Sequence, residues 1–267
     1  MAELSRYWGN HSMSLVLYEV NDKIATIILN RPDKLNAYNE EMVGELYETW
    51  QRFAKDPDAW TAIITGSGRA FCSGHDMKVL VEGGETQYKD HDSPTLWYGE
   101  VEIYKPIIAA VNGYAFGGGC SLSLGCDIRI ASEDAVFAYP QPKYGVMSLG
   151  GHQRLPKLIP PGIAMEFMLT ARNITAEEAA RWGMVNKVVP KDRLMDEARE
   201  MAHLINQNAP LAVRHTKEAL LKGLRTPDVR EGINMAKLVS YRLQTSDDSR
   251  EGLAAFTEKR KASWNAR

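Results

Sequence analysis

The chain has 267 residues, of which 44% are hydrophobic and 25% charged, and its formal net charge is −2. This length is enough to bury a large core as one domain, or as one domain with a small appendage. The near-neutral balance provides no basic surface for nucleic acid, and no apolar run approaches the roughly 20 residues needed to cross a bilayer. We therefore expect neither nucleic acid nor a membrane as a partner.

The N-terminus and the cysteines both favour a cytoplasmic location. Residues 1–13, which we take as an N-terminal extension, lack the basic start and apolar middle of a signal peptide. The three cysteines form no CxxC pair and do not suggest a disulfide framework. The six histidines are scattered without the i, i+4 spacing of a helical ligand pair, so we predict no metal site.

Strand-like and helix-like segments alternate along the first part of the chain. Asn21-Asp22 separates the first two strand-like runs as a hairpin turn, and Asn39 is placed to cap a helix over 40–56. Such alternation indicates repeated ββα or βα units around a largely buried sheet. The expected strands lie within residues 14–20, 23–30, 61–68, 105–113, 126–132 and 135–140.

The pattern becomes helical in the C-terminal part. Residues 161–183 predict two short helices, apolar residues recur at helical spacing across 191–207, and residues 249–264 predict a last helix. The expected domain plan is a core over 14–200 followed by a helical region over 201–267. That region is too small to bury its apolar faces alone, so we expect it to pack on the core or on a partner subunit.

The stretch FGGGCSLSLGCD, residues 116–127, places a glycine run at the start of a predicted helix. A dinucleotide fingerprint would need a glycine in place of Leu122, and a phosphate-binding P-loop would need Gly-Lys-Ser/Thr where Cys120 and Ser121 stand. Two interpretations remain. The backbone N–H groups at the helix start stabilise an anion or an oxyanion, or the glycines only let the helix pack closely on the sheet.

A second stretch, GRAFCSGHDMKVL at residues 68–80, has the same layout. An apolar strand leads to Ser73-Gly74, and polar residues then open a helix. Two strand-to-helix turns of this kind can each direct one N–H at a single oxygen. The pair of stretches therefore favours the oxyanion interpretation over a purely structural turn.

Several segments, in order along residues 14–262, carry a resemblance to a known family. They are LNRPDKLNAYN, GSGRAFCSGHDMK, KPIIAAVNGYAFGGGCSLSLGCDIRIAS, FAYPQPKYGV with GGHQRLPKLI, MEFMLTARNITAEEAARWGMVNKVV and EGLAAFTEKRK. The chain resembles the crotonase (enoyl-CoA hydratase/isomerase) family. The resemblance implies an α/β fold, a crotonase-like spiral of ββα units with a helical C-terminal trimerisation region, assembled as a homotrimer or a dimer of trimers. It also implies an acyl-CoA thioester as substrate, with coenzyme A as part of that substrate and no separate cofactor.

The resemblance also implies which residues form the site. In this family two backbone N–H groups hold the thioester oxygen, and here they fall at His75 and Gly118. Glycine at 118 lets a ligand approach the backbone without a Cβ in the way. The lysines of the site would face the phosphates of coenzyme A, although each also fits ordinary solvated surface. The implied substrate-binding residues are Lys34, Leu35, Ala37, Gly74, Asp76, Met77, Lys78, Gly117, Tyr139 and Lys259.

The two positions at which hydratases of the family carry glutamates hold Ser121 and Gln141. Hydration of an enoyl thioester needs one group to activate water and another to donate a proton at Cα. Serine and glutamine do not titrate near neutral pH. Two alternatives to an ordinary hydratase therefore stay open: an enzyme with altered chemistry, such as a decarboxylase, and a non-catalytic acyl-CoA-binding homologue.

Other polar residues expected around the pocket carry less information. His75 is the best titratable group, and its ring either takes part in the chemistry or points elsewhere. Residues 77–104 are expected to shape the acyl pocket, and their aromatic residues suggest an apolar or ring-shaped acyl group. The remaining residues expected near the pocket are Lys143, Ser148 and His152, and the aromatic ones are Trp97, Tyr98 and Tyr104.

Overall fold

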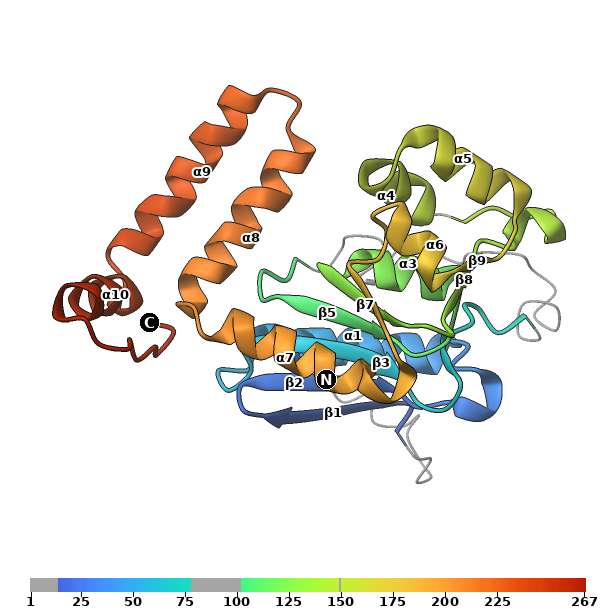
Figure 1. Ribbon diagram of the computed structural model, residues 1–267, viewed down its shortest axis with the longest axis horizontal. Coiled ribbons are helices and arrows are strands. Elements are labelled where there is room, and N and C mark those ends of the chain that lie inside the picture. Colours follow the sequence, from blue (N-terminus) through green and yellow to red (C-terminus); the bar gives the residue numbers. More distant parts are fainter. Residues whose placement is uncertain (1–13, 78–101, 149) are drawn as a thin grey trace, which may run out of the picture.

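The computed structural model describes residues 14–77, 102–148 and 150–267. The first pair of strands in its largest sheet is antiparallel, and every other neighbouring pair is parallel. Figure 1 shows this sheet running through the centre and base of the molecule. Its six strands follow the spatial order β1 (Val16–Asn21), β2 (Ile24–Leu29), β3 (Thr61–Gly66), β5 (Ile107–Val111), β7 (Ile128–Ser132) and β10 (Lys187–Val189).

A second, four-stranded sheet is interleaved with the first along the chain. Each of β3, β5 and β7 in the large sheet is followed by a short strand in the small one, so the chain steps repeatedly from one sheet to the other. This stepping is the repeat that the alternating sequence pattern predicts. The small sheet has the order β4 (Ala70–Cys72), β6 (Tyr114–Phe116), β8 (Val136–Ala138) and β9 (Ile174–Thr175).

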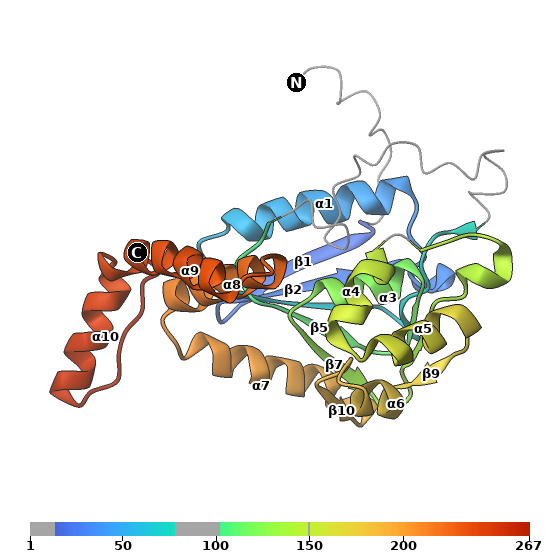
Figure 2. The ribbon, with the colours of Figure 1, turned by 90° about the horizontal axis from the view of Figure 1, so that it is seen from above.

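Helices cover both faces of the large sheet. Figure 2 shows α1 (Glu40–Lys55) on one face and α7 (Leu194–Asn206) on the other. Every residue of β3 and β5 is buried as a result, which agrees with their continuous apolar sequences. The side chain of Asn39 accepts a hydrogen bond from the N–H of Met42 and caps α1 as predicted.

Two local predictions need correction. The first hairpin turns at Asp22 and Lys23, both with positive φ, one residue later than the Asn21-Asp22 signal suggested. The last helix ends at Glu258 instead of continuing to residue 264. Lys259 adopts a left-handed conformation there, with φ +52, and its N–H closes the last turn on the carbonyls of Ala255 and Phe256. The chain then turns back, and the buried carboxylate of Asp248 accepts hydrogen bonds from the N–H groups of residues 265 and 266.

The remaining helices lie around the ends of the sheets and in the C-terminal region. The two short helices expected within residues 161–183 are confirmed, with β9 between them. The helix expected within 191–207 is α7, which extends across the predicted domain boundary at residue 200. The other helices are α3 (Gly118–Gly125), α4 (Gly150–Leu158), α5 (Pro161–Thr170), α6 (Ala176–Arg181), α8 (Pro210–Arg225), α9 (Val229–Gln244) and α10 (Asp247–Glu258).

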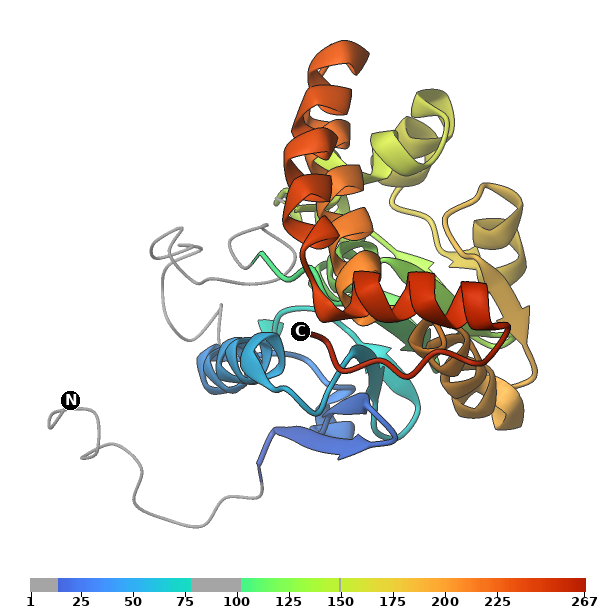
Figure 3. The same ribbon diagram turned by 90° about the vertical axis from the view of Figure 1, so that its left-hand side faces the viewer.

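The C-terminal helices form an arm beside the core. Figure 1 shows α8 and α9 as a hairpin that rises beyond the sheet, and Figure 3 shows α10 lying across its foot. The carboxylate of Glu218 is only 5% exposed and pairs with Lys222 and Arg242 at 2.5 and 2.6 Å, which ties α8 to α9. This arm leaves large apolar side chains exposed, among them Leu220, Leu224, Val229, Leu238 and Tyr241.

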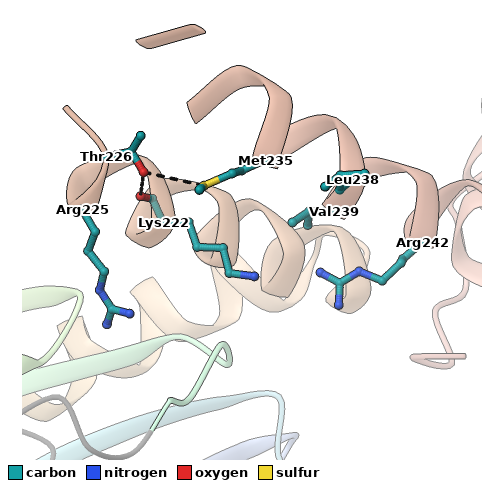
Figure 4. Close-up of a pocket in the computed structure, with 7 residues that line it drawn as sticks. All are labelled: Lys222, Arg225, Thr226, Met235, Leu238, Val239 and Arg242. Carbon is teal, nitrogen blue, oxygen red and sulfur yellow. Dashed lines mark hydrogen bonds between the residues drawn. The ribbon is translucent and has the colours of Figure 1, made fainter. Parts of the chain in front are cut away.

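A groove of about 520 Å³ lies between α8 and α9. Figure 4 shows Thr226 at one end of it, where the Thr226 hydroxyl donates to the Lys222 carbonyl at 3.0 Å and lies 3.6 Å from the sulfur of Met235. The groove is amphipathic, with aliphatic side chains on α9 and cationic ones on both helices. Its lining residues are Lys222, Arg225, Thr226, Met235, Leu238, Val239 and Arg242.

Arg129 fixes the carboxyl end of α3. This side chain is buried, and its guanidinium donates to the carbonyls of Cys126 at 2.7 Å, Ser123 at 3.3 Å and Met184 at 2.6 Å. A cation is favourable at the carboxyl end of a helix, where unpaired carbonyls gather. These hydrogen bonds at the carboxyl end fix the direction of α3. The first turn of the helix then points toward the edge of the small sheet.

Candidate active site

The first turn of α3 is the place where three segments of the chain meet. A Cβ added at Gly74 would lie 2.8 Å from the Phe116 carbonyl oxygen and 3.3 Å from the Gly118 nitrogen. A Cβ added at Gly118 would lie only 1.8 Å from the hydroxyl oxygen of Tyr38. The turn after β4, the glycine run after β6 and the loop before α1 are therefore in direct contact.

The topology explains why two turns that are distant in sequence meet here. Strands β4 and β6 are parallel neighbours, so their carboxyl ends lie at the same edge of the small sheet. Gly117 then caps α3 with φ +52 and ψ −113, a backbone conformation that side chains disfavour. The N–H of Gly118 follows at the first helical position, where α3 has no carbonyl for it to bond. The sequence-predicted pair of turns is thus brought together.

Tyr38 joins the third segment to this turn through its backbone and its side chain. Its N–H donates to the Gly74 carbonyl at 2.9 Å, and its carbonyl accepts from the N–H of Asp76 at 3.1 Å. Its hydroxyl oxygen lies 2.8 Å from Nδ1 of His75, and the two rings pack with their centroids 4.2 Å apart. Residue 75 is therefore held in place on both sides.

The loop that carries Tyr38 is anchored by Asn36. This fully buried side chain accepts a hydrogen bond from the Arg31 N–H at 2.8 Å, and its amide donates to the carbonyls of Ser67 at 2.9 Å and Ala70 at 2.8 Å. The Arg31 guanidinium in turn pairs with the Asp76 carboxylate at 2.8 Å. Asp76, predicted from the resemblance to contact substrate, therefore makes an ion pair that connects two of the three segments.

Burial shifts the titration of the polar groups at the site. It lowers the pKa of the His75 imidazole from 6.5 to about 4 because the cationic form is poorly solvated there. It raises the pKa of the Tyr139 hydroxyl well above 10 and that of the Cys120 thiol to about 12. At neutral pH these three side chains are uncharged.

Ser121 and Gln141, which the resemblance predicts to stand in place of glutamates, both lie near the start of α3. Ser121 is buried, and its hydroxyl lies 3.1 Å from the hydroxyl of Tyr139. Gln141 packs against Gly117, where an added Cβ would lie 2.8 Å from its amide nitrogen. The amide oxygen of Gln141 is buried and has no hydrogen-bond partner within the part of the chain that the structure describes. It is an acceptor available to a donor on a ligand.

The other residues implied by the resemblance differ in burial and in distance from this turn. Ala37 is buried beside Tyr38, while Lys34 and Met77 are exposed. Lys259 caps the carboxyl end of α10, and Figure 1 shows that helix at the opposite end of the molecule from α3. Within one chain Lys259 is not brought to the site. Lys78, Trp97, Tyr98 and residues 1–13 lie outside the described residues.

The remaining polar residues expected near the pocket differ in burial and in hydrogen bonding. Ser148 is buried, Lys143 is exposed, and Nδ1 of His152 is buried without a partner among residues that the structure describes. The Tyr104 hydroxyl donates to the Glu102 carboxylate at 2.8 Å. Within residues 14–77, 102–148 and 150–267 no group of three or more His, Cys, Asp or Glu is placed to hold a metal ion, and no helix is long and apolar enough to span a membrane.

Tyr38 is the site residue that the sequence did not suggest. It lies in a turn-rich segment, and nothing in the spacing of residues 38, 75 and 118 relates them to one another. The one local signal is a phenol among small polar and aliphatic residues in KLNAYN. Only the parallel bridge between residues 38 and 75 brings the hydroxyl to the glycine run.

Comparison with known proteins adds a family to this geometry. The profile of the enoyl-CoA hydratase/isomerase family matches residues 19–267. The chain belongs to this family. Enoyl-CoA hydratase from Bacillus anthracis, a solved structure, superimposes with a TM-score of 0.89 at 34% identity, covering 95% of this chain and 100% of that one. The predicted crotonase fold is therefore confirmed, as is membership of an acyl-CoA-processing enzyme family.

Similar members of the enoyl-CoA hydratase/isomerase family carry different names. The (E)-benzylidenesuccinyl-CoA hydratase of Thauera aromatica is 40% identical over 250 residues, which cover 92% of this chain and 96% of that protein. The carnitinyl-CoA dehydratase of Proteus mirabilis is 42% identical over 254 residues, which cover 91% and 95% respectively. The family therefore includes relatives of nearly equal similarity with different named substrates.

The lowered pKa of His75 predicts how stability depends on pH. Below about pH 6.5 the unfolded chain takes up a proton at residue 75, whereas the folded chain resists it until about pH 4. The free energy of unfolding therefore falls through this window as the pH is lowered. Relative to a His75→Asn variant, the wild type should lose about 1–3 kcal/mol between about pH 7 and about pH 4.5.

Urea unfolding of both proteins at the two pH values measures this difference. His203→Asn is the matched control, because His203 lies exposed on α7. A wild type and a His75→Asn variant whose stabilities change in parallel with pH would contradict the neutral, buried state of the imidazole.

Proposed function

We propose that this protein transforms an acyl-CoA thioester through an enolate or oxyanion whose oxygen accepts hydrogen bonds from the backbone N–H groups of His75 and Gly118. The observation that carries the proposal is the contact of the two turns, in which Gly74 lies against the Gly118 nitrogen. Two donors fixed before the ligand arrives are worth roughly 3–4 kcal/mol each toward a developing negative charge. The amino end of α3 adds a favourable dipole.

The neutral residues at positions 121 and 141 restrict the reaction. With Ser121 bonded to Tyr139 and an amide at Gln141, neither position can act as a general base near neutral pH. We propose a lyase or isomerase reaction in which enolate stabilisation contributes more than proton abstraction by a carboxylate. Decarboxylation is a second candidate, since loss of CO₂ forms the enolate without any base.

The names of two relatives bear on which acyl group this protein accepts. A benzylidenesuccinyl thioester carries a free carboxylate on its acyl chain, whereas a carnitinyl thioester carries a quaternary ammonium cation. The neutral residues Ser121 and Gln141 provide no carboxylate that would repel an acidic chain or attract a cationic one, so they favour an acidic acyl chain. A non-catalytic acyl-CoA-binding role would share the same backbone donors, so turnover must be measured directly. The cytoplasm stays our predicted location.

We also propose a threefold assembly, as a trimer or a dimer of trimers. The support is the exposed apolar surface of the arm, on which Leu220, Leu224 and Val229 are between 64% and 78% exposed. Surfaces of this kind on soluble proteins are commonly covered by other subunits. A role for Lys259 in substrate binding would likewise require a neighbouring copy of the chain.

Crotonyl-CoA hydration tests the reaction. We expect it to be at least about 10³-fold slower than in a family member that carries both glutamates, because a positioned acid/base pair is absent. Mass spectrometry of a panel of enoyl-, hydroxyacyl- and malonyl-type thioesters identifies the accepted substrate. Rapid crotonyl-CoA hydration that is unchanged in Ser121→Ala and Gln141→Ala variants would contradict this expectation, and tight binding with no turnover at all would favour the non-catalytic role.

Gly118→Ala tests the backbone donor. The added methyl group would meet the Tyr38 hydroxyl at 1.8 Å, so either the phenol or the approaching thioester is displaced. We expect turnover of the accepted thioester to fall by at least about 100-fold with the fold retained. Gly44→Ala is the matched control, because a Cβ there meets no atom within 4 Å. Equal turnover in both variants would exclude Gly118 from the site.

The assembly is tested by light scattering. Burial of the apolar faces of α8 and α9 between subunits should give a molar mass three or six times that of the 29.9 kDa chain at micromolar concentration. Replacing Leu224 by lysine on the exposed face should weaken the assembly, whereas the same change at Leu204 on α7 serves as a control for added charge at an exposed leucine. A stable wild-type monomer would contradict the proposal.

A further inference from the structure

The hydroxyl of Tyr38 occupies a position that the proposed reaction can use. Tyr38 is only 5% exposed. Its hydroxyl oxygen is the atom nearest to a Cβ added at Gly118, at a distance of 1.8 Å. The proposed backbone donor is the N–H of this same residue, Gly118. A thioester oxygen bound by that N–H would bring its Cα close to the phenol.

The hydroxyl is also coupled to a second group that can carry a proton. Its oxygen lies 2.8 Å from Nδ1 of His75, a residue that is partly exposed to solvent. Burial keeps that imidazole neutral, with its pKa lowered to about 4. A neutral imidazole can take a proton at one nitrogen while giving one from the other.

Every reaction considered above ends or begins with a proton at Cα of the thioester. Decarboxylation and hydration both require Cα of an enolate to be protonated, and the positions of the usual carboxylates hold Ser121 and Gln141. The Ser121 hydroxyl is engaged with Tyr139, and a glutamine amide does not titrate. Among the residues that the structure describes at this turn, the Tyr38 hydroxyl beside Gly118 is the candidate that is left to supply the proton.

We propose that Tyr38 is the catalytic residue that protonates Cα, with the His75 ring as the group that positions and recharges it. This inference rests on the proposed enolate mechanism. The enolate Cα forms a C–H bond with the phenol hydrogen, and the electron pair of the broken O–H bond stays on the Tyr38 oxygen. That oxygen takes the hydrogen from Nδ1 of His75, and Nε2 takes a proton from solvent. The imidazole ends neutral, in its other tautomer, and the net change is one solvent proton added to the enolate.

Tyr38→Phe is a clean test of this assignment. Both backbone hydrogen bonds of residue 38 remain, because they involve only its N–H and carbonyl, and the phenyl ring can keep the packing on His75 and Gly118. The variant thus removes the hydroxyl and leaves the turn in place. Tyr18→Phe is the matched control. Tyr18 lies on β1, and this variant deletes a tyrosine hydroxyl that donates a hydrogen bond to the Asp56 carboxylate at 2.9 Å.

The measurement is deuterium incorporation at Cα of butyryl-CoA, a saturated thioester, in D₂O, followed by mass spectrometry. Exchange requires the proposed proton transfers in both directions, first from Cα to the enzyme and then back to Cα. It requires no other reaction of the acyl chain. We expect wild type and Tyr18→Phe to exchange at equal rates, and Tyr38→Phe to exchange at least about 100-fold more slowly with an unchanged dissociation constant for butyryl-CoA. His75→Ala, which keeps its backbone N–H, should also slow exchange while binding is retained.

The outcomes separate this inference from the proposed function. Exchange by Tyr38→Phe at the wild-type rate would overturn the role of Tyr38 and leave enolate stabilisation intact. A parallel loss of binding and exchange in Tyr38→Phe would overturn it in favour of a purely structural hydroxyl. Wild-type protein that binds butyryl-CoA without exchange would overturn it as well. Wild-type protein that does not bind any of the CoA thioesters would instead refute the proposed function.

Discussion

The parallel pairing of β4 with β6 is the constraint on which the site depends. Because both strands run in one direction, the chain must leave each of them at the same edge of the small sheet. The turn after Cys72 and the glycine run after Phe116 are thus forced into contact. Glycine is required where they touch, since a side chain at Gly74 would overlap the Phe116 carbonyl. The first peptide groups of α3 are presented at this meeting point.

The donors at this point are held from several directions before any ligand is bound. Arg129 holds the carboxyl end of α3 through the carbonyls of Ser123 and Cys126, while Tyr38 contacts the amino end of α3 and both neighbours of His75. Asn36 anchors the Tyr38 loop to Ser67 and to the first residue of β4, Ala70. Groups fixed in this way need little reorganisation when charge develops, which is the main source of electrostatic stabilisation in enzymes.

The charge at the site differs from what a carboxylate-based mechanism would require. Among the described residues of this turn, the titratable side chains are a phenol, an imidazole that burial keeps neutral, and the Asp76 carboxylate, which is paired with Arg31. A neutral surface beside a helix amino end favours an anionic intermediate and imposes no charge repulsion on an acidic acyl chain. In the mechanism that we propose, backbone donors and a hydroxyl therefore take the place of carboxylates.

The sequence by itself determined the types and order of the elements, the Asn39 cap and the buried strands, because these depend on local propensity and on periodicity along the chain. The resemblance carried by its motifs also predicted His75 and Gly118 as backbone donors. Tertiary structure alone decided that Tyr38 reaches His75, that Ser121 pairs with Tyr139 and that the chain after the last helix returns to Asp248. Each of these depends on a hydrogen bond between residues distant in sequence. Such bonds form only when packing brings the partners together, and no local pattern encodes that.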